Sequence, residues 1–289
     1  MPKKIRHAAL FINKQKPGAV LLGKKITTFL KKKKITVCSS LESDVETCLE
    51  KADIAISLGG DGTILSLVRA MKKRSVPVLG VNFGRLGFLN EVHPGDILKE
   101  LENALSGNLP IEERMMLECR ARSVKHQIDQ KLVALNDMVI SREGVSRLVA
   151  LDISVSGQKL AAFRGDGVIL ATPTGSTAYS LSAGGAVVHP RVDSIMITPI
   201  CPHASSMHPT IIPANEKVVI AIRRERREAR AVLTADGQEI IEVDDSFHIE
   251  VTRFALPFRL MKSSRQNYYE TLNRHLHFSN LGYGKTIDR

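Results

Sequence analysis

Apolar runs that alternate with helical patterns constrain the fold of this chain most, and they fill its first 105 residues. The runs are rich in β-branched residues and cover residues 6–12, 35–37, 54–58 and 76–81. Patterns with helical spacing follow them at residues 19–30, 42–51, 64–72 and 95–105. Strands that are apolar along their whole length and alternate with helices are typical of a parallel sheet covered on both faces. We therefore expect an α/β domain over residues 1–115.

The periodicity changes near residue 115, and short strand patterns separated by turn residues follow. These patterns cover residues 116–121, 131–135, 148–155, 168–171, 217–222, 231–234 and 247–251. Many short strands in succession predict an all-β domain, here over residues 116–265. A helical pattern returns at about 266–278, and we expect this last helix to pack on the first domain.

The charge balance of the chain is basic, because 41 Lys and Arg residues stand against 30 Asp and Glu and give a net charge of +11. This excess favours polyanionic partners, namely nucleotides, polyphosphate, nucleic acid or an acidic membrane surface. We interpret two basic runs, Lys31–Lys34 and Arg223–Arg227, as solvated surface at a helix end and at a hairpin tip. The chain has no Trp and four Tyr, which argues against a platform of stacked bases.

The four cysteines are scattered at Cys38, Cys48, Cys119 and Cys201, without a C-x-x-C spacing. We expect reduced thiols, mostly buried as small apolar side chains, as in a cytosolic protein. The apolar stretch 8–12 is too short for the core of a signal peptide, and no run is long enough to span a membrane. The expected location is therefore cytoplasmic.

The strand pattern 54–58 leads directly into Gly59-Gly60-Asp61-Gly62-Thr63, and an apolar helical pattern starts at once. Glycines at such a turn let backbone N–H groups approach an anion, and the dipole of the helix favours a phosphate there. An acid is unexpected in a bare phosphate cradle, although Asp61 could simply cap the helix. We favour a carboxylate that handles a hydroxyl group or a metal ion during phosphoryl transfer.

Two further motifs lie in the expected β domain. Asn136-Asp137 follows a strand pattern and by itself fits an ordinary Asx turn, or an amide and a carboxylate that bind a base and a ribose. The run 163–185 contains a strand pattern that continues into Thr-Pro-Thr-Gly-Ser-Thr-Ala-Tyr. Ser176 or Thr177 could cap a helix whose N–H groups face an anion, and Tyr179 offers a ring for stacking. So many small and hydroxyl residues in sequence predict a binding loop.

Together, Gly59–Thr63, Leu135–Asp137, the run 163–185 and Pro199–His203 closely resemble the motifs of NAD kinases over nearly the whole chain. The resemblance implies the two-domain fold of that family, a Rossmann-like α/β N-terminal domain and an all-β C-terminal domain. It implies transfer of the γ-phosphoryl group of ATP, or of a phosphoryl group of polyphosphate, to the 2′-hydroxyl of the adenosine ribose of NAD, which makes NADP. Mg²⁺ as cofactor and a homodimer or homotetramer are further implications.

The resemblance also assigns roles to residues of this chain. Asp61 would be the catalytic acceptor of the 2′-hydroxyl proton, and no side chain is assigned to a metal ion. Nucleotide phosphates would bind at Gly59, Gly60, Gly62 and Thr63. NAD would also contact Asp61 and Gly62. The other NAD-binding positions would be Phe88, Asn136, Asp137, Thr177, Ala178, Tyr179, Ser180, Leu181, Ser182, Arg164, Asp166, Arg147 and Gln238. Arg164 and Asp166 would lie near the nicotinamide, and Arg147 and Gln238 match the family less securely.

Two positions depart from the family pattern. Asp137 stands where many members have Glu, which shortens its reach to a ribose hydroxyl, and His208 replaces a common Arg. Two other function classes remain as alternatives. A lipid kinase shares the Gly-Gly-Asp turn but leaves the run 163–185 unexplained. A nucleic-acid-binding protein explains the net charge but not three acids, Asp61, Asp137 and Asp166, which would repel a phosphate backbone.

Overall fold

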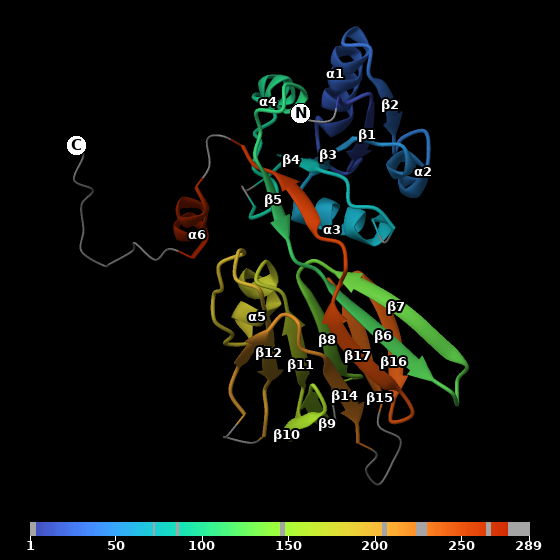
Figure 1. Ribbon diagram of the computed structural model, residues 1–289, viewed down its shortest axis with the longest axis vertical. Helices are drawn as coiled ribbons and strands as arrows, with labels where there is room; N and C mark the ends of the chain where they lie inside the picture. Colours follow the sequence, from blue (N-terminus) through green and yellow to red (C-terminus); the bar gives the residue numbers. More distant parts are fainter. Residues whose placement is uncertain are drawn as a thin grey trace, which may run out of the picture. The chain divides into compact units, whose positions relative to one another are not determined.

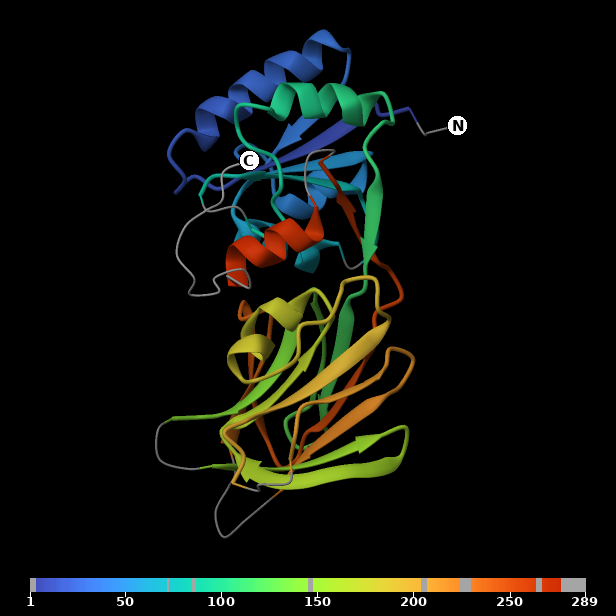
Figure 2. The same cartoon turned by 90° about the vertical axis from the view of Figure 1, so that its left-hand side faces the viewer.

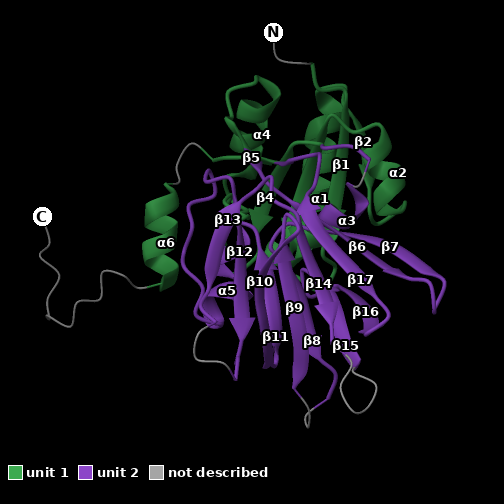
Figure 3. Ribbon diagram, turned by 60° about the horizontal axis from the view of Figure 1, so that its bottom comes forward, with its two compact units in different colours: residues 1–67, 76–112, 259–289 green, residues 68–75, 113–258 purple. Residues whose placement is uncertain are grey.

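The computed structural model describes residues 4–71, 73–84, 87–144, 148–203, 207–223, 230–263 and 267–276. The chain divides into two compact units, coloured separately in Figure 3. Unit 1 comprises residues 1–67, 76–112 and 259–289, and unit 2 comprises residues 68–75 and 113–258. No helix in the described ranges is long and apolar enough to cross a membrane.

Unit 1 is built on a six-stranded sheet with the order β2-β1-β3-β4-β18-β5. The pairs β1–β2, β1–β3, β3–β4 and β4–β18 are all parallel, which confirms the predicted parallel sheet. The elements of this part of the chain, all but β18 labelled in Figure 1, are β1 (His7–Ile12), α1 (Ala19–Lys32), β2 (Thr36–Ser39), α2 (Val45–Glu50), β3 (Ile54–Gly59), α3 (Asp61–Ala70), β4 (Val78–Asn82), α4 (Ile97–Leu105), β5 (Ile111–Arg114), β18 (Phe258–Met261) and α6 (Tyr268–Leu276).

The central strands of this sheet are apolar along their length because both faces are covered. Every residue of β3 and of β4 is buried. Ile26 and Leu30 of α1 share one apolar cluster with Ile97 and Leu101 of α4, so these two helices cover the same face (Figure 2). The lysine run does lie at a helix end, since α1 ends at Lys32.

The expectation of four reduced thiols is wrong. Cys38 of β2 and Cys48 of α2 form a disulfide, whereas Cys119 and Cys201 are free. The chain reverses between β2 and α2 and brings the Cα atoms of Cys38 and Cys48 to 5.2 Å, within the range that a disulfide requires. A spacing of ten residues carries no disulfide signal by itself, so the pair could not be read from the sequence.

Unit 2 is an all-β structure of two antiparallel six-stranded sheets, which confirms the predicted class. Sheet B has the order β10-β9-β14-β17-β6-β7, and sheet C has the order β13-β12-β11-β8-β15-β16. Their strands, with two short helices of the same unit, are β6 (Leu117–Ser123), β7 (Ile128–Ala134), β8 (Asp137–Arg142), β9 (Val149–Val155), β10 (Gln158–Gly165), β11 (Gly167–Ala171), η1 (Gly175–Thr177), α5 (Tyr179–Ser182), β12 (Ser194–Ile200), β13 (Thr210–Pro213), β14 (Val218–Ile222), β15 (Arg230–Ala235), β16 (Glu239–Asp244) and β17 (His248–Arg253).

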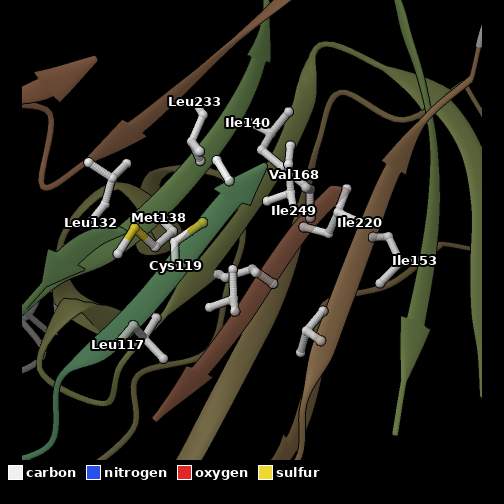
Figure 4. Packing of buried hydrophobic residues seen from close by; sticks show 14 of the residues in the cluster. Leu117, Cys119, Leu132, Met138, Ile140, Ile153, Val168, Ile220, Leu233 and Ile249 are labelled. Atoms are coloured by element: carbon white, nitrogen blue, oxygen red, sulfur yellow. The ribbon is translucent and has the colours of Figure 1, made fainter. Parts of the chain in front are cut away.

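The core of unit 2 lies between its two sheets. Alternate residues of β6 point inward, and Leu117, Cys119 and Ala121 are fully buried there. Figure 4 shows side chains of sheet B, such as Ile249, meeting side chains of sheet C, such as Ile140. The predicted hairpin around 223–227 is wrong, because β14 pairs within sheet B and β15 within sheet C. Residues 224–227 of that basic run lie outside the described residues.

Candidate functional site

The Gly-Gly-Asp-Gly-Thr turn lies where ligands commonly bind in α/β sheets, at the carboxyl end of a central strand. Gly59 is the last residue of β3, and α3 begins at Asp61. A Cβ atom at Gly59 would lie 2.0 Å from Oγ1 of Thr63, so packing requires that glycine. At Gly60 and Gly62 a Cβ atom would meet nothing within 4 Å. Packing therefore does not explain these two glycines, and the open space beside them suits a ligand that approaches the backbone.

The Asp61 carboxylate binds a loop on the far side of β4 and does not cap its own helix. It accepts hydrogen bonds from the backbone N–H groups of Phe88 (3.0 Å) and Asn90 (3.2 Å) and from Nδ2 of Asn90 (3.0 Å). A Cβ atom at Gly87 would lie 2.2 Å from Oδ1 of Asp61, so this glycine allows the loop to approach. Three N–H groups thus fix the orientation of the carboxylate.

Asn90 is a residue of this site that the sequence did not reveal. Its side chain is fully buried, and its Oδ1 lies 2.6 Å from the position that a Cβ atom at Gly80 of β4 would take. The bond to Asp61 spans 29 residues and depends on how the loop folds back, which no local pattern encodes. The ring of Phe88, predicted to lie near the adenine, packs against His275 of α6 with the ring centroids 4.8 Å apart.

A cavity of about 360 Å³ lies elsewhere in unit 1, and a cavity of about 350 Å³ in unit 2 contains predicted NAD-binding residues. The residues that line the cavity of unit 2 are Asn136, Asp137, Val139, Ser141, Ala178, Tyr179, Thr234, Asp236 and Gly237. The structure thereby brings together the Asn136-Asp137 pair and the Ala178-Tyr179 end of the long motif, which are about forty residues apart in sequence. The Tyr179 side chain is 46% exposed, so one ring remains available to a ligand.

Asp236 holds the Asn136-Asp137 pair in place. Its carboxylate accepts hydrogen bonds from the backbone N–H groups of Leu135 (2.9 Å), Asn136 (2.7 Å) and Asp137 (3.1 Å). Asp236 and Gly237 both have positive φ, 51° and 63°, in the tight turn between β15 and β16. Asp236 was not among the predicted site residues, although Asp-Gly between two strand patterns is a strong hairpin signal.

Burial perturbs both carboxyl groups of this cavity. It raises the pKa of Asp137 to about 7, with repulsion by Asp236 as the second cause. It also raises the pKa of Asp236 to about 6, although the three N–H donors act in the opposite direction. Perturbed acids in a cavity are typical of functional sites.

The loop after β11 packs tightly on Asn136 and does not form the capped helix that we predicted. Its two short helices, η1 and α5, have Thr174 and Ala178 as N-caps, and neither side chain caps the helix. Ser176 instead bonds to the backbone of Pro173 and Val188. A Cβ atom at Gly175 would lie 2.1 Å from the carbonyl oxygen of Asn136, so only glycine permits this contact.

Several predicted NAD-binding residues lie outside the cavity lining. Ser180 is buried and hydrogen-bonded to Thr198 (2.8 Å), and Thr177 bonds back to Thr174. Leu181 and Ser182 belong to α5, and Gln238 follows the Asp236-Gly237 turn with its N–H bonded to Ala235. Arg147 lies outside the described residues.

Arg164 and Asp166 lie at the opposite end of β11 from Asp137. Asp137 pairs with Ala171, the last residue of β11, whereas Asp166 immediately precedes its first residue. At about 3.3 Å per residue, the strand separates the two ends by roughly 15 Å. Asp166 forms an ion pair with Arg142 (2.5 Å), so its carboxylate is already balanced by a cation.

Family models match most of the chain. The ATP-NAD kinase N-terminal domain matches residues 44–109, and the ATP-NAD kinase C-terminal domain matches residues 135–263. An NAD kinase of Geotalea daltonii is 39% identical over 78% of this chain and 79% of its own length. An NAD kinase of Symbiobacterium thermophilum is also 39% identical, over 93% of this chain and 98% of its own length.

Solved structures show the same fold. A yeast NADH kinase in complex with NADH superposes with a TM-score of 0.90 at 25% identity, covering 100% of this chain and 91% of that chain. An NAD kinase from Archaeoglobus fulgidus in complex with ATP gives a TM-score of 0.76 at 27% identity, covering 94% and 98%.

Proposed function

The chain belongs to the NAD kinase family and is a phosphotransferase, and we propose from this premise that it transfers the γ-phosphoryl group of ATP to the 2′-hydroxyl of NAD. The observation that carries this proposal is the Asp61 carboxylate, held by three N–H groups beside two glycines that packing does not require. The product would be NADP. Neither the lipid kinase nor the nucleic-acid-binding alternative accounts for a family match over residues 135–263.

The phosphates of the donor would bind at the turn, with Gly60 and Gly62 as the points of close approach and Gly59 and Thr63 as its frame. ATP is the favoured donor over polyphosphate, because the related enzyme of Archaeoglobus fulgidus was solved with ATP. In the described ranges, no group of three or more His, Cys, Asp or Glu side chains is placed to hold a metal ion. Mg²⁺ would bind mainly through the nucleotide phosphates, where it would neutralise their charge.

The cavity of unit 2 would bind the adenosine of NAD. The Asn136 amide can pair with an adenine edge, and the Tyr179 ring can stack on the base. The carboxyl group of Asp137 has a pKa of about 7. Near neutral pH it can therefore donate a hydrogen bond to a ribose hydroxyl when protonated and accept one when ionised. Arg164 and Asp166, at the other end of β11, would serve the nicotinamide side.

Asp61 would act on the 2′-hydroxyl. A carboxylate has about four acceptor sites, and three N–H groups occupy three of them, so one remains for the hydroxyl proton. The 2′-oxygen attacks the γ-phosphorus, the bond from that phosphorus to the bridging oxygen breaks, and ADP leaves. Asp61 orients the hydroxyl and takes its proton late, as the catalytic Asp of protein kinases does.

Asp61→Asn tests the proposal. We expect turnover to fall by roughly 10²–10⁴, the range for a lost acid–base group, while NAD still binds. The assay supplies NAD, ATP and Mg²⁺ and detects the product with an NADP-specific dehydrogenase. Asp129→Asn, an exposed acid of β7, is the matched control and should leave turnover unchanged. Near-normal turnover in Asp61→Asn would contradict the assigned role, and no product from the unaltered protein would contradict the function.

A further inference from the structure

Asn90 makes two of the three hydrogen bonds that hold Asp61, one from its backbone and one from its side chain. Its backbone N–H (3.2 Å) and its Nδ2 (3.0 Å) both donate to Oδ1 of Asp61. Among the described residues, Oδ2 accepts only the Phe88 N–H (3.0 Å). Each carboxylate oxygen has two lone pairs, so Oδ1 is fully occupied and the remaining acceptor site is on Oδ2.

The amide of Asn90 can face Asp61 in only one orientation. Its NH₂ group donates to the carboxylate, and the reverse orientation would set the amide oxygen against an oxygen that cannot donate. The amide oxygen itself is buried and has no hydrogen-bond partner in the described part of the chain. Such atoms are rare and costly in folded proteins. Packing alone would favour an apolar side chain at this position, so the bond to Asp61 accounts for the amide.

Strand β4 makes room for this side chain. Gly80 lies in the middle of β4, and a Cβ atom there would lie 2.6 Å from Oδ1 of Asn90 and 2.9 Å from the carbonyl oxygen of Leu89. Glycine inside a strand weakens it and often marks the close approach of another segment. The chain thus has a glycine in a buried strand at the point where the Asn90 segment lies against it.

The residues that follow Asn90 fix its position. The Val92 N–H donates to the carbonyl oxygen of Gly80 (3.1 Å), which ties the segment to β4. Glu91 is buried, and its carboxylate accepts a hydrogen bond from the Ser263 N–H (3.2 Å). A donor that is fixed in this way holds a carboxylate in one geometry and needs no reorganisation during a reaction.

We propose that Asn90 is a positioning residue, which occupies Oδ1 of Asp61 and leaves Oδ2 as the atom that accepts the 2′-hydroxyl proton. The inference rests on the proposed function, in which the 2′-oxygen attacks the γ-phosphorus, Asp61 takes the hydroxyl proton and ADP leaves. Because Asn90 is fully buried, it acts through Asp61 and does not touch the substrate. Its loss should therefore lower kcat and leave the binding of NAD and ATP nearly unchanged.

Asn90→Ala and Asn90→Asp test this role in the NADP-forming assay. Asn90→Ala removes one donor and lets the carboxylate turn, so kcat should fall roughly 10–100-fold while the KM values for NAD and ATP stay within about twofold. Asn90→Asp keeps the shape of the side chain but sets a second carboxyl oxygen where Nδ2 lies, 3.0 Å from Oδ1 of Asp61. The two carboxyl groups compete for one proton, so the fall in kcat on the acidic side of the pH profile should move to higher pH by about one pH unit or more. Asn108→Asp, at an exposed residue after α4, is the matched control and should change neither kcat nor its pH profile.

The carbon NMR signal of the Asp61 carboxyl group gives a readout that does not depend on activity. The signal is identified by its absence from Asp61→Asn, and in Asn90→Asp it should titrate at higher pH than in the unaltered protein. Normal kcat in Asn90→Ala, an unmoved pH profile in Asn90→Asp, or an unchanged NMR titration would each overturn the role of Asn90. If Asn90→Ala fails to fold, the isosteric Asn90→Asp decides. Absence of NADP formation by the unaltered protein would instead overturn the proposed function, and the NMR titration would still test the contact between the two side chains.

Discussion

Asp236→Asn would test how the Asn136-Asp137 pair is held. The N–H groups of Asn136 and Asp137 donate to Oδ1 of Asp236, and the N–H group of Leu135 donates to Oδ2. An Asn with its amide oxygen at the Oδ1 position keeps two of these bonds and turns its NH₂ group toward the Leu135 N–H. Leaving that N–H without an acceptor costs about 1–3 kcal/mol of the free energy of unfolding.

The lost hydrogen bond destabilises Asp236→Asn, whereas ionisation of the buried Asp236 destabilises the unaltered protein. The difference in stability between the two proteins therefore depends on pH. Burial raises the pKa of Asp236 from 3.8 to about 6. When the pKa of a carboxyl group is higher in the folded state than in the unfolded state, the protein loses stability as the pH rises from the unfolded-state pKa through the folded-state pKa. At about 1.4 kcal/mol per pKa unit, the protein loses roughly 3 kcal/mol between about pH 4 and pH 7, and Asp236→Asn removes this loss.

We therefore expect Asp236→Asn to be less stable than the unaltered protein at pH 4.5, by about 1–3 kcal/mol. At pH 8 the difference should close or reverse. Urea unfolding at both pH values measures it, and Glu242→Gln, an exposed acid of the same hairpin, should stay within about 0.5 kcal/mol at both. An equal loss of stability for Asp236→Asn at pH 4.5 and at pH 8 would refute this reasoning.

Three other substitutions test the disulfide, the loop after β11 and the glycine-rich turn. Cys38→Ser opens the disulfide to Cys48 and should lower the free energy of unfolding by about 2–3 kcal/mol, with dithiothreitol having the same effect on the unaltered protein but none on the variant. Gly175→Ala places a methyl group against the Asn136 carbonyl oxygen, which should raise the KM for NAD and lower the Tm; an unchanged KM would show that this contact does not shape the cavity. Gly60→Ala meets no protein atom, so its Tm should stay near that of the unaltered protein while kcat falls; normal kcat would remove Gly60 from the phosphate site.

The fold class of each unit could be predicted because the burial of a strand determines its pattern of apolar residues. Strands such as β3 and β4 are buried on both faces and therefore read as continuous apolar runs. Strand β13 was missed because its four residues are too few to show a period, and β16 was missed although its burial alternates. The pairing of β18 with β4 was equally invisible, because it joins segments about 180 residues apart.

In the candidate site, too, local motifs could be predicted from the sequence, whereas contacts between distant residues could not. The Gly-Gly-Asp-Gly-Thr turn could be located because three glycines around an acid are unusual for an ordinary turn. The Asn136-Asp137 pair fits an ordinary turn by itself and could be located only through its resemblance to a family motif. Asn90 could not be found, since its role depends on a loop that folds back onto Asp61. The Ser176 cap was wrongly predicted because that hydroxyl group finds partners at Val188, twelve residues later.

The position of β18 has a consequence for how the chain folds as it is synthesised. Unit 1 contains residues from before and after unit 2, and β18 pairs with β4 only once residue 261 has been added. Until then the β4 edge lacks this partner, and exposed strand edges are prone to pair with other chains. We expect chains that stall before residue 258 to aggregate through unit 1, whereas unit 2 already contains most of its sequence. Completion of the sheet of unit 1 therefore depends on a strand that is synthesised after all of unit 2.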